Sequence, residues 1–203
     1  SKNNSYNRIL STYSKKLNLD LKYIISNLFW TNLKNTLNMV LGFIFNILII
    51  KYLSENDLGL WYWFISLIAQ FSIFSITGYR SVGRNLLIEK IYSSFHKITL
   101  YRFLGSTIGS LILIGSSLYA FYYHTSIWMY FLLLAIFIHI YYLRFYVDYL
   151  YSIDEFKKLS SIGIFESVIS HTLGIITLIS TENLLYVILV FYGSQLIINL
   201  LIS

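Results

Sequence analysis

Six long apolar stretches alternate with short polar segments along this chain. Each is about 20 residues long, and about 20 helical residues at 1.5 Å per residue cross a hydrocarbon core ~30 Å thick. The pattern predicts an all-α integral membrane protein with six transmembrane helices. They are expected at residues 33–53, 58–79, 100–122, 126–147, 159–180 and 183–203.

The remaining segments predict two amphipathic elements. Residues 1–28 combine apolar positions with lysines and are expected to form a lead at the cytoplasmic face, before a six-helix bundle over 29–203. Residues 82–99 place leucine, isoleucine and phenylalanine on one helical face with charged residues opposite. An apolar face flanked by cations is typical of a helix that lies in the membrane interface.

The basic residues fall on one side of this layout. Of the 15 Lys and Arg residues, only Lys51 lies in a connection on the outer side. Lys and Arg are enriched in cytoplasmic loops, and this bias sets the orientation of membrane proteins. Both termini are therefore expected in the cytoplasm.

Composition supports the membrane class. Charged residues make up 12% of the chain, about half of the ~25% that is usual for soluble domains. The net charge of +6 comes from cations at helix ends, where anionic lipids attract them, so no nucleic-acid partner is expected. The absence of cysteine excludes disulfides, a thiol nucleophile and a thiolate metal site.

The first apolar stretch carries a polar stripe. Thr31, Asn35, Asn38, Gly42 and Asn46 are spaced by three or four residues, which places them within about 80° on one helix face. An unpaired amide in hydrocarbon costs several kcal/mol. The stripe is therefore expected to face either neighbouring helices or a water-lined cavity, and the sequence leaves both open.

Two titratable residues, Glu166 and His171, lie in the fifth stretch, with Glu166 about six residues from its start. An acid inside a membrane helix is by default a functional candidate. The alternatives are a carboxylate that reaches the headgroups or one that pairs with Lys34. Arg144 and Asp148, spaced i,i+4, are expected to pair at the inner interface.

Two further patterns concern packing and boundaries. Gly105 and Gly109 have the small-xxx-small spacing that permits close helix packing. Trp61, Trp63 and Trp128 fall at outer helix ends and are expected to anchor the bundle at the membrane interface.

No catalytic motif is present. The four histidines, at positions 96, 124, 139 and 171, are scattered without an HExxH pair, and the sequence contains no GxSxG, GxGxxG or GxxxxGK[ST] motif. The chain is therefore not expected to be an enzyme, and neither a metal nor a cofactor is expected.

Two connecting segments carry a resemblance to a known family. The segment after the first stretch reads Lys51-Tyr-Leu-Ser-Glu-Asn-Asp-Leu-Gly-Leu-Trp61, and the second stretch closes in Ile76-Thr-Gly-Tyr-Arg-Ser-Val-Gly-Arg-Asn85. This resembles Wzx-type polysaccharide or O-antigen flippases of the MOP (MATE-like) superfamily. In that family the first turn commonly reads basic-x-Leu-Gly-x-x-x-Phe/Tyr-Gly, and a Gly-containing segment followed by Arg closes the second helix. Ser54 stands where the family often has Gly, and an acid usual before the Gly of helix two is absent.

The resemblance implies both an architecture and a location. The family has two pseudo-symmetric lobes, and residues 27–203 resemble the N-terminal one, so the second lobe would come from the same gene or another chain. The implied protein lies in a bacterial or archaeal plasma or inner membrane. It would move a polyprenyl-diphosphate-linked oligosaccharide from the cytoplasmic to the outer leaflet by alternating access.

The resemblance also implies a cavity between the lobes. Amides would bind sugar hydroxyls and cations would bind the diphosphate, although setting the topology is the alternative role for the arginines. The candidates for the substrate cavity are Lys34, Asn35, Asn38, Asn46, Arg80 and Arg84. Glu166 and His171 are candidates for coupling transport to Na⁺, H⁺ or the membrane potential.

Three alternatives remain open. A drug or metabolite exporter of the same superfamily would share the fold but lack the cationic lining. A membrane enzyme acting on polyprenyl-phosphate sugars would need a charged cluster in an outer loop. A membrane protein of polysaccharide assembly that does not itself transport would have a dry, packed polar stripe.

Overall fold

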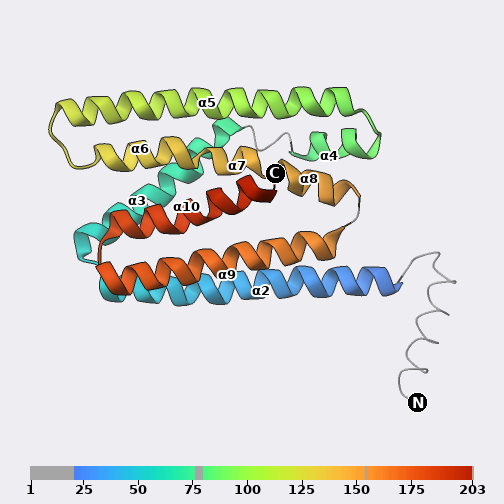
Figure 1. Ribbon diagram of the computed structural model, residues 1–203, viewed down its shortest axis with the longest axis horizontal. Helices are drawn as coiled ribbons and strands as arrows, with labels where there is room; N and C mark the ends of the chain where they lie inside the picture. Colours follow the sequence, from blue (N-terminus) through green and yellow to red (C-terminus); the bar gives the residue numbers. More distant parts are fainter. Residues whose placement is uncertain (1–20, 76–79, 154, 203) are drawn as a thin grey trace, which may run out of the picture.

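The structure is a computed structural model that describes residues 21–75, 80–153 and 155–202, and every regular element in these ranges is a helix (Figure 1). The elements are α2 (Leu21–Tyr52), α3 (Glu55–Phe71), the 3-10 helix η1 (Ser72–Ser75), α4 (Arg80–Ile88), α5 (Tyr92–Tyr122), α6 (Trp128–Phe137), α7 (His139–Leu143), α8 (Phe145–Ser152), α9 (Phe156–Thr181) and α10 (Leu184–Ile202). Most of the predicted lead, residues 1–20, and residues 76–79 of the second predicted span lie outside the described residues.

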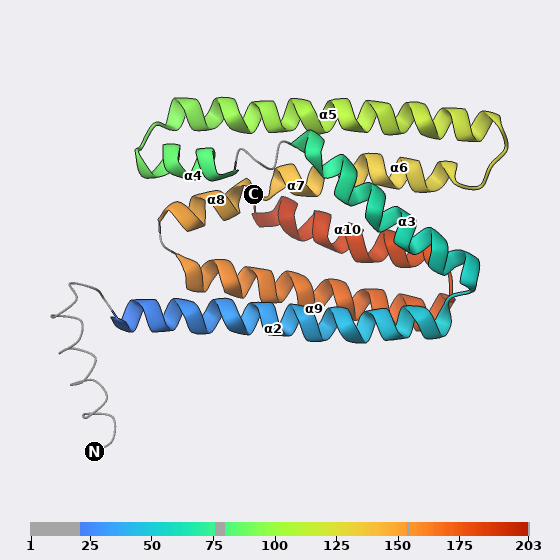
Figure 2. The ribbon, with the colours of Figure 1, turned by 180° about the vertical axis from the view of Figure 1, so that it is seen from behind.

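The helices form an elongated antiparallel bundle. α2 packs along α9, α5 packs along α6, and α3 and α10 cross the middle of the molecule between these pairs (Figures 1 and 2). The turns that follow α2, α5 and α9 lie at one end, together with Lys51. The turn between α4 and α5 and the start of α9 lie at the other end, with Lys90, Lys157 and Lys158 (Figure 1). The charge asymmetry of the sequence is therefore an asymmetry between the two ends of the bundle.

Five helices within the described residues are long and apolar enough to cross a membrane, judged by length and composition. They run over Tyr23–Tyr52, Glu55–Phe74, Tyr92–Tyr122, Phe156–Thr181 and Leu184–Ile202. Their outer faces are apolar, with Met39 69% and Leu201 82% exposed. Contiguous apolar surface is unfavourable in water and suits contact with lipid chains. The prediction of an all-α fold with helices long and apolar enough to cross a membrane is confirmed for the described residues.

The fourth predicted span is not one helix. Residues 126–147 divide into α6, α7 and the start of α8, and α6 alone is only 10 residues long. The Ser110 hydroxyl donates a hydrogen bond to the Ala135 carbonyl at 2.7 Å. In an uninterrupted helix that carbonyl would accept from the His139 N–H four residues on, and a side chain that enters this ladder kinks a helix.

The predicted amphipathic helix 82–99 is also divided. α4 ends at Ile88, and residues 92–99 instead form the first two turns of α5. Lys90 adopts a left-handed φ of 59°. The Ile91 N–H donates to the Leu86 carbonyl and the Lys90 N–H to the Leu87 carbonyl, at 2.8 and 3.0 Å. This Schellman motif usually has glycine at the left-handed position, so a lysine there gave no stop signal. α2, in contrast, begins earlier than predicted and includes residues 21–28 of the predicted lead.

Aromatic side chains form the centre of the core. Phe45 stacks on Phe191 with ring centroids 5.0 Å apart, and Trp61 meets Phe45 edge to face at 5.8 Å. Phe64 is fully buried and lies 5.6 Å from the ring of Tyr192. Trp61 is only 3% exposed. Its expected role at the membrane interface is therefore wrong, because its ring joins α3 to α2 and α10.

Gly109 provides a matched test of helix packing. A Cβ at Gly109 would lie 3.0 Å from the Phe74 Cβ and 2.9 Å from the Ile138 Cδ1. We expect Gly109→Leu to destabilise the bundle by about 1–3 kcal/mol through overpacking. Gly115, on the same helix, has no described heavy atom within 4 Å of such a Cβ, so Gly115→Leu should be close to neutral. Thermal unfolding in detergent would measure the stability of both variants. An equal loss of stability in the two would contradict the close packing of α5 at Gly109.

Candidate functional site

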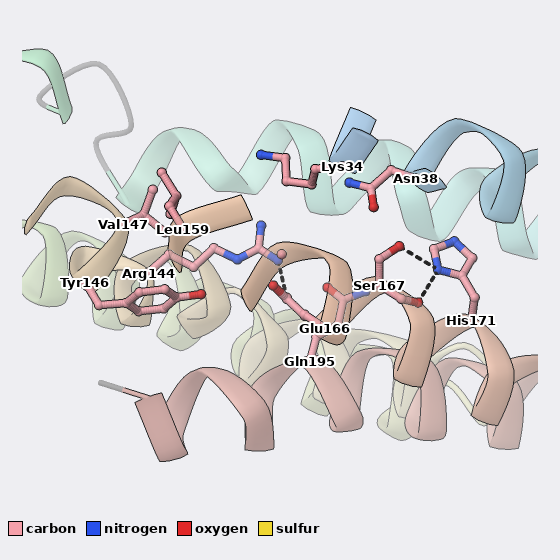
Figure 3. Close-up of a pocket in the computed structure, with 11 residues that line it drawn as sticks. Lys34, Asn38, Arg144, Tyr146, Val147, Leu159, Glu166, Ser167, His171 and Gln195 are labelled. Carbon is pink, nitrogen blue, oxygen red and sulfur yellow. Dashed lines mark hydrogen bonds and ion pairs between the residues drawn. The ribbon is translucent and has the colours of Figure 1, made fainter. Parts of the chain in front are cut away.

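A polar cavity of about 380 Å³ opens between α2, α8, α9 and α10 (Figure 3). Five elements contribute to its wall: α2, the α7–α8 junction, α8, α9 and α10. The lining residues are Lys34, Asn38, Arg144, Tyr146, Val147, Leu159, Gly163, Glu166, Ser167, His171 and Gln195. Two cations and one carboxylate stand among them, so the wall carries a surplus of positive charge.

An ion pair lies on one side of the cavity. The Arg144 Nη2 donates to the Glu166 Oε1 (Figure 3). The same oxygen accepts from the Asn199 Nδ2 at 3.0 Å. The Tyr146 hydroxyl donates to the Asn199 Oδ1 at 3.2 Å. Asn199 is fully buried, and the Glu166 side chain is 10% exposed. The network fixes the carboxylate on the cavity wall and ties α8 to α9 and α10.

Glu166 lies deeper in its helix than the sequence indicates. α9 begins at Phe156, ten residues before Glu166, which corresponds to about 15 Å along a helix. The Glu166 side chain is only 10% exposed, and a carboxylate buried to this extent needs a counter-charge close by. Arg144 provides it, so Lys34, the partner considered from the sequence, is not the one that the structure selects.

Lys34 reaches the cavity by crossing α9 at a glycine. A Cβ at Gly163 would lie 2.8 Å from the Lys34 Cδ. Only a residue without a side chain leaves this path to the lysine stem. Figure 3 shows Lys34 and Asn38 of α2 across the cavity from Glu166. The glycine thus brings a second cation to the cavity that Arg144 lines from the other side.

His171 closes the deep end of the cavity. Its ring lies edge to face against Phe45 and Phe191, with centroids 5.6 and 5.2 Å apart. The Nδ1 lies 2.8 Å from the Ser167 carbonyl oxygen. A carbonyl only accepts, which assigns the proton to Nδ1 and leaves Nε2 as an acceptor in the neutral ring. The Nε2 faces α2, 4.0 Å from where a Cβ of Gly42 would lie.

The structure brings together four of the residues singled out from the sequence: Lys34, Asn38, Glu166 and His171. Asn35 and Asn46 are exposed and do not line the cavity. Asn46 donates to the Gly42 carbonyl of its own helix at 2.9 Å. An amide that is satisfied within its own helix no longer requires a polar cavity.

Arg84, one of the two arginines proposed for the substrate, does not line the cavity. The Arg84 Nε donates to the Asp148 Oδ1 at 3.2 Å, and the Arg102 Nη1 donates to Oδ2 at 3.1 Å. Arg80 begins α4, and its side chain lies outside the described part of the structure. The expected Arg144–Asp148 pair is wrong, because the helix breaks at Arg144 and the i,i+4 geometry is lost.

Sequence reasoning missed Arg144, Gln195 and Asn199 as parts of the site. The i,i+4 spacing of Arg144 and Asp148 predicts a local pair instead of a place in a cavity. Gln195 and Asn199 are amides four residues apart inside the last apolar stretch, and this spacing was the signal that could have found them. Both lie on the side of α10 that meets α9.

The fold and the cavity define a class: an all-α protein whose long apolar helices surround a cationic polar cavity. Comparisons with models of known protein families, with curated proteins and with solved structures find no match. Among residues 21–75, 80–153 and 155–202, no three His, Asp or Glu side chains come together as metal ligands.

Proposed function

We propose that this chain is a lobe of a membrane transporter that flips a polyprenyl-diphosphate-linked oligosaccharide from the cytoplasmic to the outer leaflet. The observation that carries the proposal is the cavity between α2 and α9, with Lys34 and Arg144 on its wall inside an apolar bundle. A diphosphate in low dielectric needs cations and hydrogen-bond donors to replace its water.

The other cavity groups suit the remaining parts of such a substrate. Asn38 and Gln195 offer amide donors and acceptors for sugar hydroxyls. The polyprenyl tail would stay in the bilayer, against the exposed apolar faces of the bundle. The cation-rich end of the bundle is proposed to face the cytoplasm, as the distribution of Lys and Arg predicts.

Alternating access requires a second lobe, which would come from the same gene or from another chain. The amide of Asn35 on α2 is exposed and does not line the cavity. A polar group in contact with lipid chains lacks hydrogen-bond partners, whereas a partner lobe with its own polar groups, or a hydrated interface, would provide them. We therefore place the partner lobe against the side of α2 that carries Asn35.

Complementation tests the proposal. The gene that encodes this chain would be expressed in a flippase-deficient strain that makes the matching glycan, and lipid-linked glycan facing the cytoplasm would be measured. We expect that pool to fall. Normal expression with an unchanged pool would contradict the proposal, and drug resistance without a change in the pool would favour the exporter instead.

A further inference from the structure

The Glu166 carboxylate is paired with Arg144, a cation on the cavity wall that a bound oxyanion would also need. We propose that Glu166 is an internal competitor, which a phosphate-type anion must displace from Arg144 in order to bind. The inference rests on the proposed function, since it assumes that the cavity takes an anionic headgroup. It adds to that function a built-in restraint on the affinity of the site.

The contacts of Arg144 support an exchange of partners. Only its Nη2 is bonded to Glu166, and its buried Nε has no hydrogen-bond partner among the residues that the structure describes. A guanidinium has five N–H donors in a planar fork that matches two oxygens of one phosphate. Glu166 therefore uses part of the donor set, and a phosphate that bridges Nε and an Nη group would use more of it.

The displaced carboxylate would not be left without partners. The Asn199 Nδ2 already donates to Glu166 at 3.0 Å, and it does so from α10, independently of Arg144. Lys34 stands on the opposite wall of the same cavity. A carboxylate that keeps a hydrogen bond and has a second cation within the cavity can give up its first partner at moderate cost.

The charged, titratable and amide groups around Glu166 come from four parts of the fold. Arg144 approaches from the α7–α8 junction, Lys34 from α2 and His171 from its own helix, while α10 contributes the amides Gln195 and Asn199. Neutralising Glu166 would raise the surplus of positive charge on the wall and release Arg144 at the same time. These two effects must be separated by the experiment.

Binding of inorganic pyrophosphate to the purified full chain in nanodiscs of neutral lipid tests the inference. We expect Glu166→Gln to tighten binding about tenfold, the value of one charge-assisted hydrogen bond. Glu166→Asp, which keeps the charge but shortens the reach to Arg144, should give a smaller gain. It also provides a second reading if the glutamine variant folds poorly, which melting curves would reveal.

The decisive comparison repeats Glu166→Gln in an Arg144→Gln background. If Glu166 competes for Arg144, the gain disappears there. A gain of equal size in both backgrounds would show a general charge effect and overturn the inference, as would no gain from either Glu166 variant. Equal binding by the unmodified chain and Arg144→Gln, or no binding by any form, would overturn the anion site itself and with it the basis of the proposed function.

Discussion

Replacing Asp148 by asparagine is expected to destabilise the bundle by about 3–5 kcal/mol, the usual cost of removing one partner from a buried ion pair. Asp148 is 1% exposed and Arg102 is 2% exposed, and their charged groups lie 3.1 Å apart. Asparagine keeps the shape of the side chain but removes the counter-charge that Asp148 gives to Arg102. Arg84 is 28% exposed and can turn to water, so the cost should arise mainly at Arg102.

Denaturant titration of the purified chain in mixed detergent would measure this loss. Glu155→Gln is the matched control, because Glu155 is exposed at the same end of the bundle and its change removes the same charge. Exposed charges contribute little, so this control should change stability by less than about 1 kcal/mol. A double variant, Asp148→Leu with Arg102→Leu, should lose less than Asp148→Asn, since it removes the buried charge of Arg102 together with that of its partner. Similar losses for Asp148→Asn and Glu155→Gln would contradict the expectation.

The cluster around Asp148 also explains why α8 matters to the site. Arg144 and Tyr146, at the start of α8, bond toward α9 and α10, while Asp148 bonds toward α4 and α5. One short helix thus joins the cavity wall to the cation-rich end of the bundle. If Asp148→Asn loses function, its stability must therefore be measured as well, to tell a direct effect on the cavity from unfolding.

The long helices could be predicted from the sequence because length and hydropathy determine them directly. A stretch of about 20 apolar residues that crosses a lipid bilayer forms a helix, because a helix pairs all of its backbone polar groups within the segment. α5, α9 and α10 each contain the predicted stretch almost entirely. Their continuation beyond it, as in residues 92–99 of α5, could not be read from hydropathy because those turns are amphipathic.

The breaks could not be predicted, because their causes lie on other helices or in unusual backbone positions. The kink before His139 depends on the Ser110 hydroxyl, 25 residues from the carbonyl that it bonds. The turns at Lys90 and His124 use left-handed φ values of 59° and 53°, which sequence patterns normally assign to glycine. Neither feature leaves a trace in the local pattern of apolar residues.

The candidate site was predictable only in part, for a related reason. Glu166 and His171 stand out because polar groups are rare in an apolar stretch, and both line the cavity. Periodicity placed Asn35, Asn38 and Asn46 on one face, but only Asn38 reaches the cavity. A helix face about 80° wide is broad enough for some of its residues to line a cavity while others lie beside its opening. Which residues line the cavity depends on where α9 packs against α2.

Under the proposed function, filling the cavity is expected to reduce transport while leaving the fold intact. We expect Gly163→Phe to reduce flipping by more than about tenfold, because the ring would take the path of Lys34 and exclude a charge-assisted contact worth ~1.5–3 kcal/mol. A Cβ at this position meets the flexible Lys34 stem, whose Cδ would be 2.8 Å away. The contacted atoms belong to the flexible lysine stem and not to backbone, so the stem can give way to the ring and the cost in stability should be small.

Two glycines serve as controls for this substitution, both assayed by the pool of cytoplasm-facing lipid-linked glycan and by thermal unfolding. Gly193→Phe makes the same change on α10, where no described heavy atom lies within 4 Å of a Cβ, and should retain both activity and stability. Gly174→Phe should unfold, because a Cβ there lies 3.1 Å from the buried ring of Phe45. Full activity of a well-folded Gly163→Phe protein would exclude the cavity as the substrate path. If Gly163→Phe loses activity only because it unfolds, the cavity has only a structural role. A substrate path can be blocked without unfolding the protein around it.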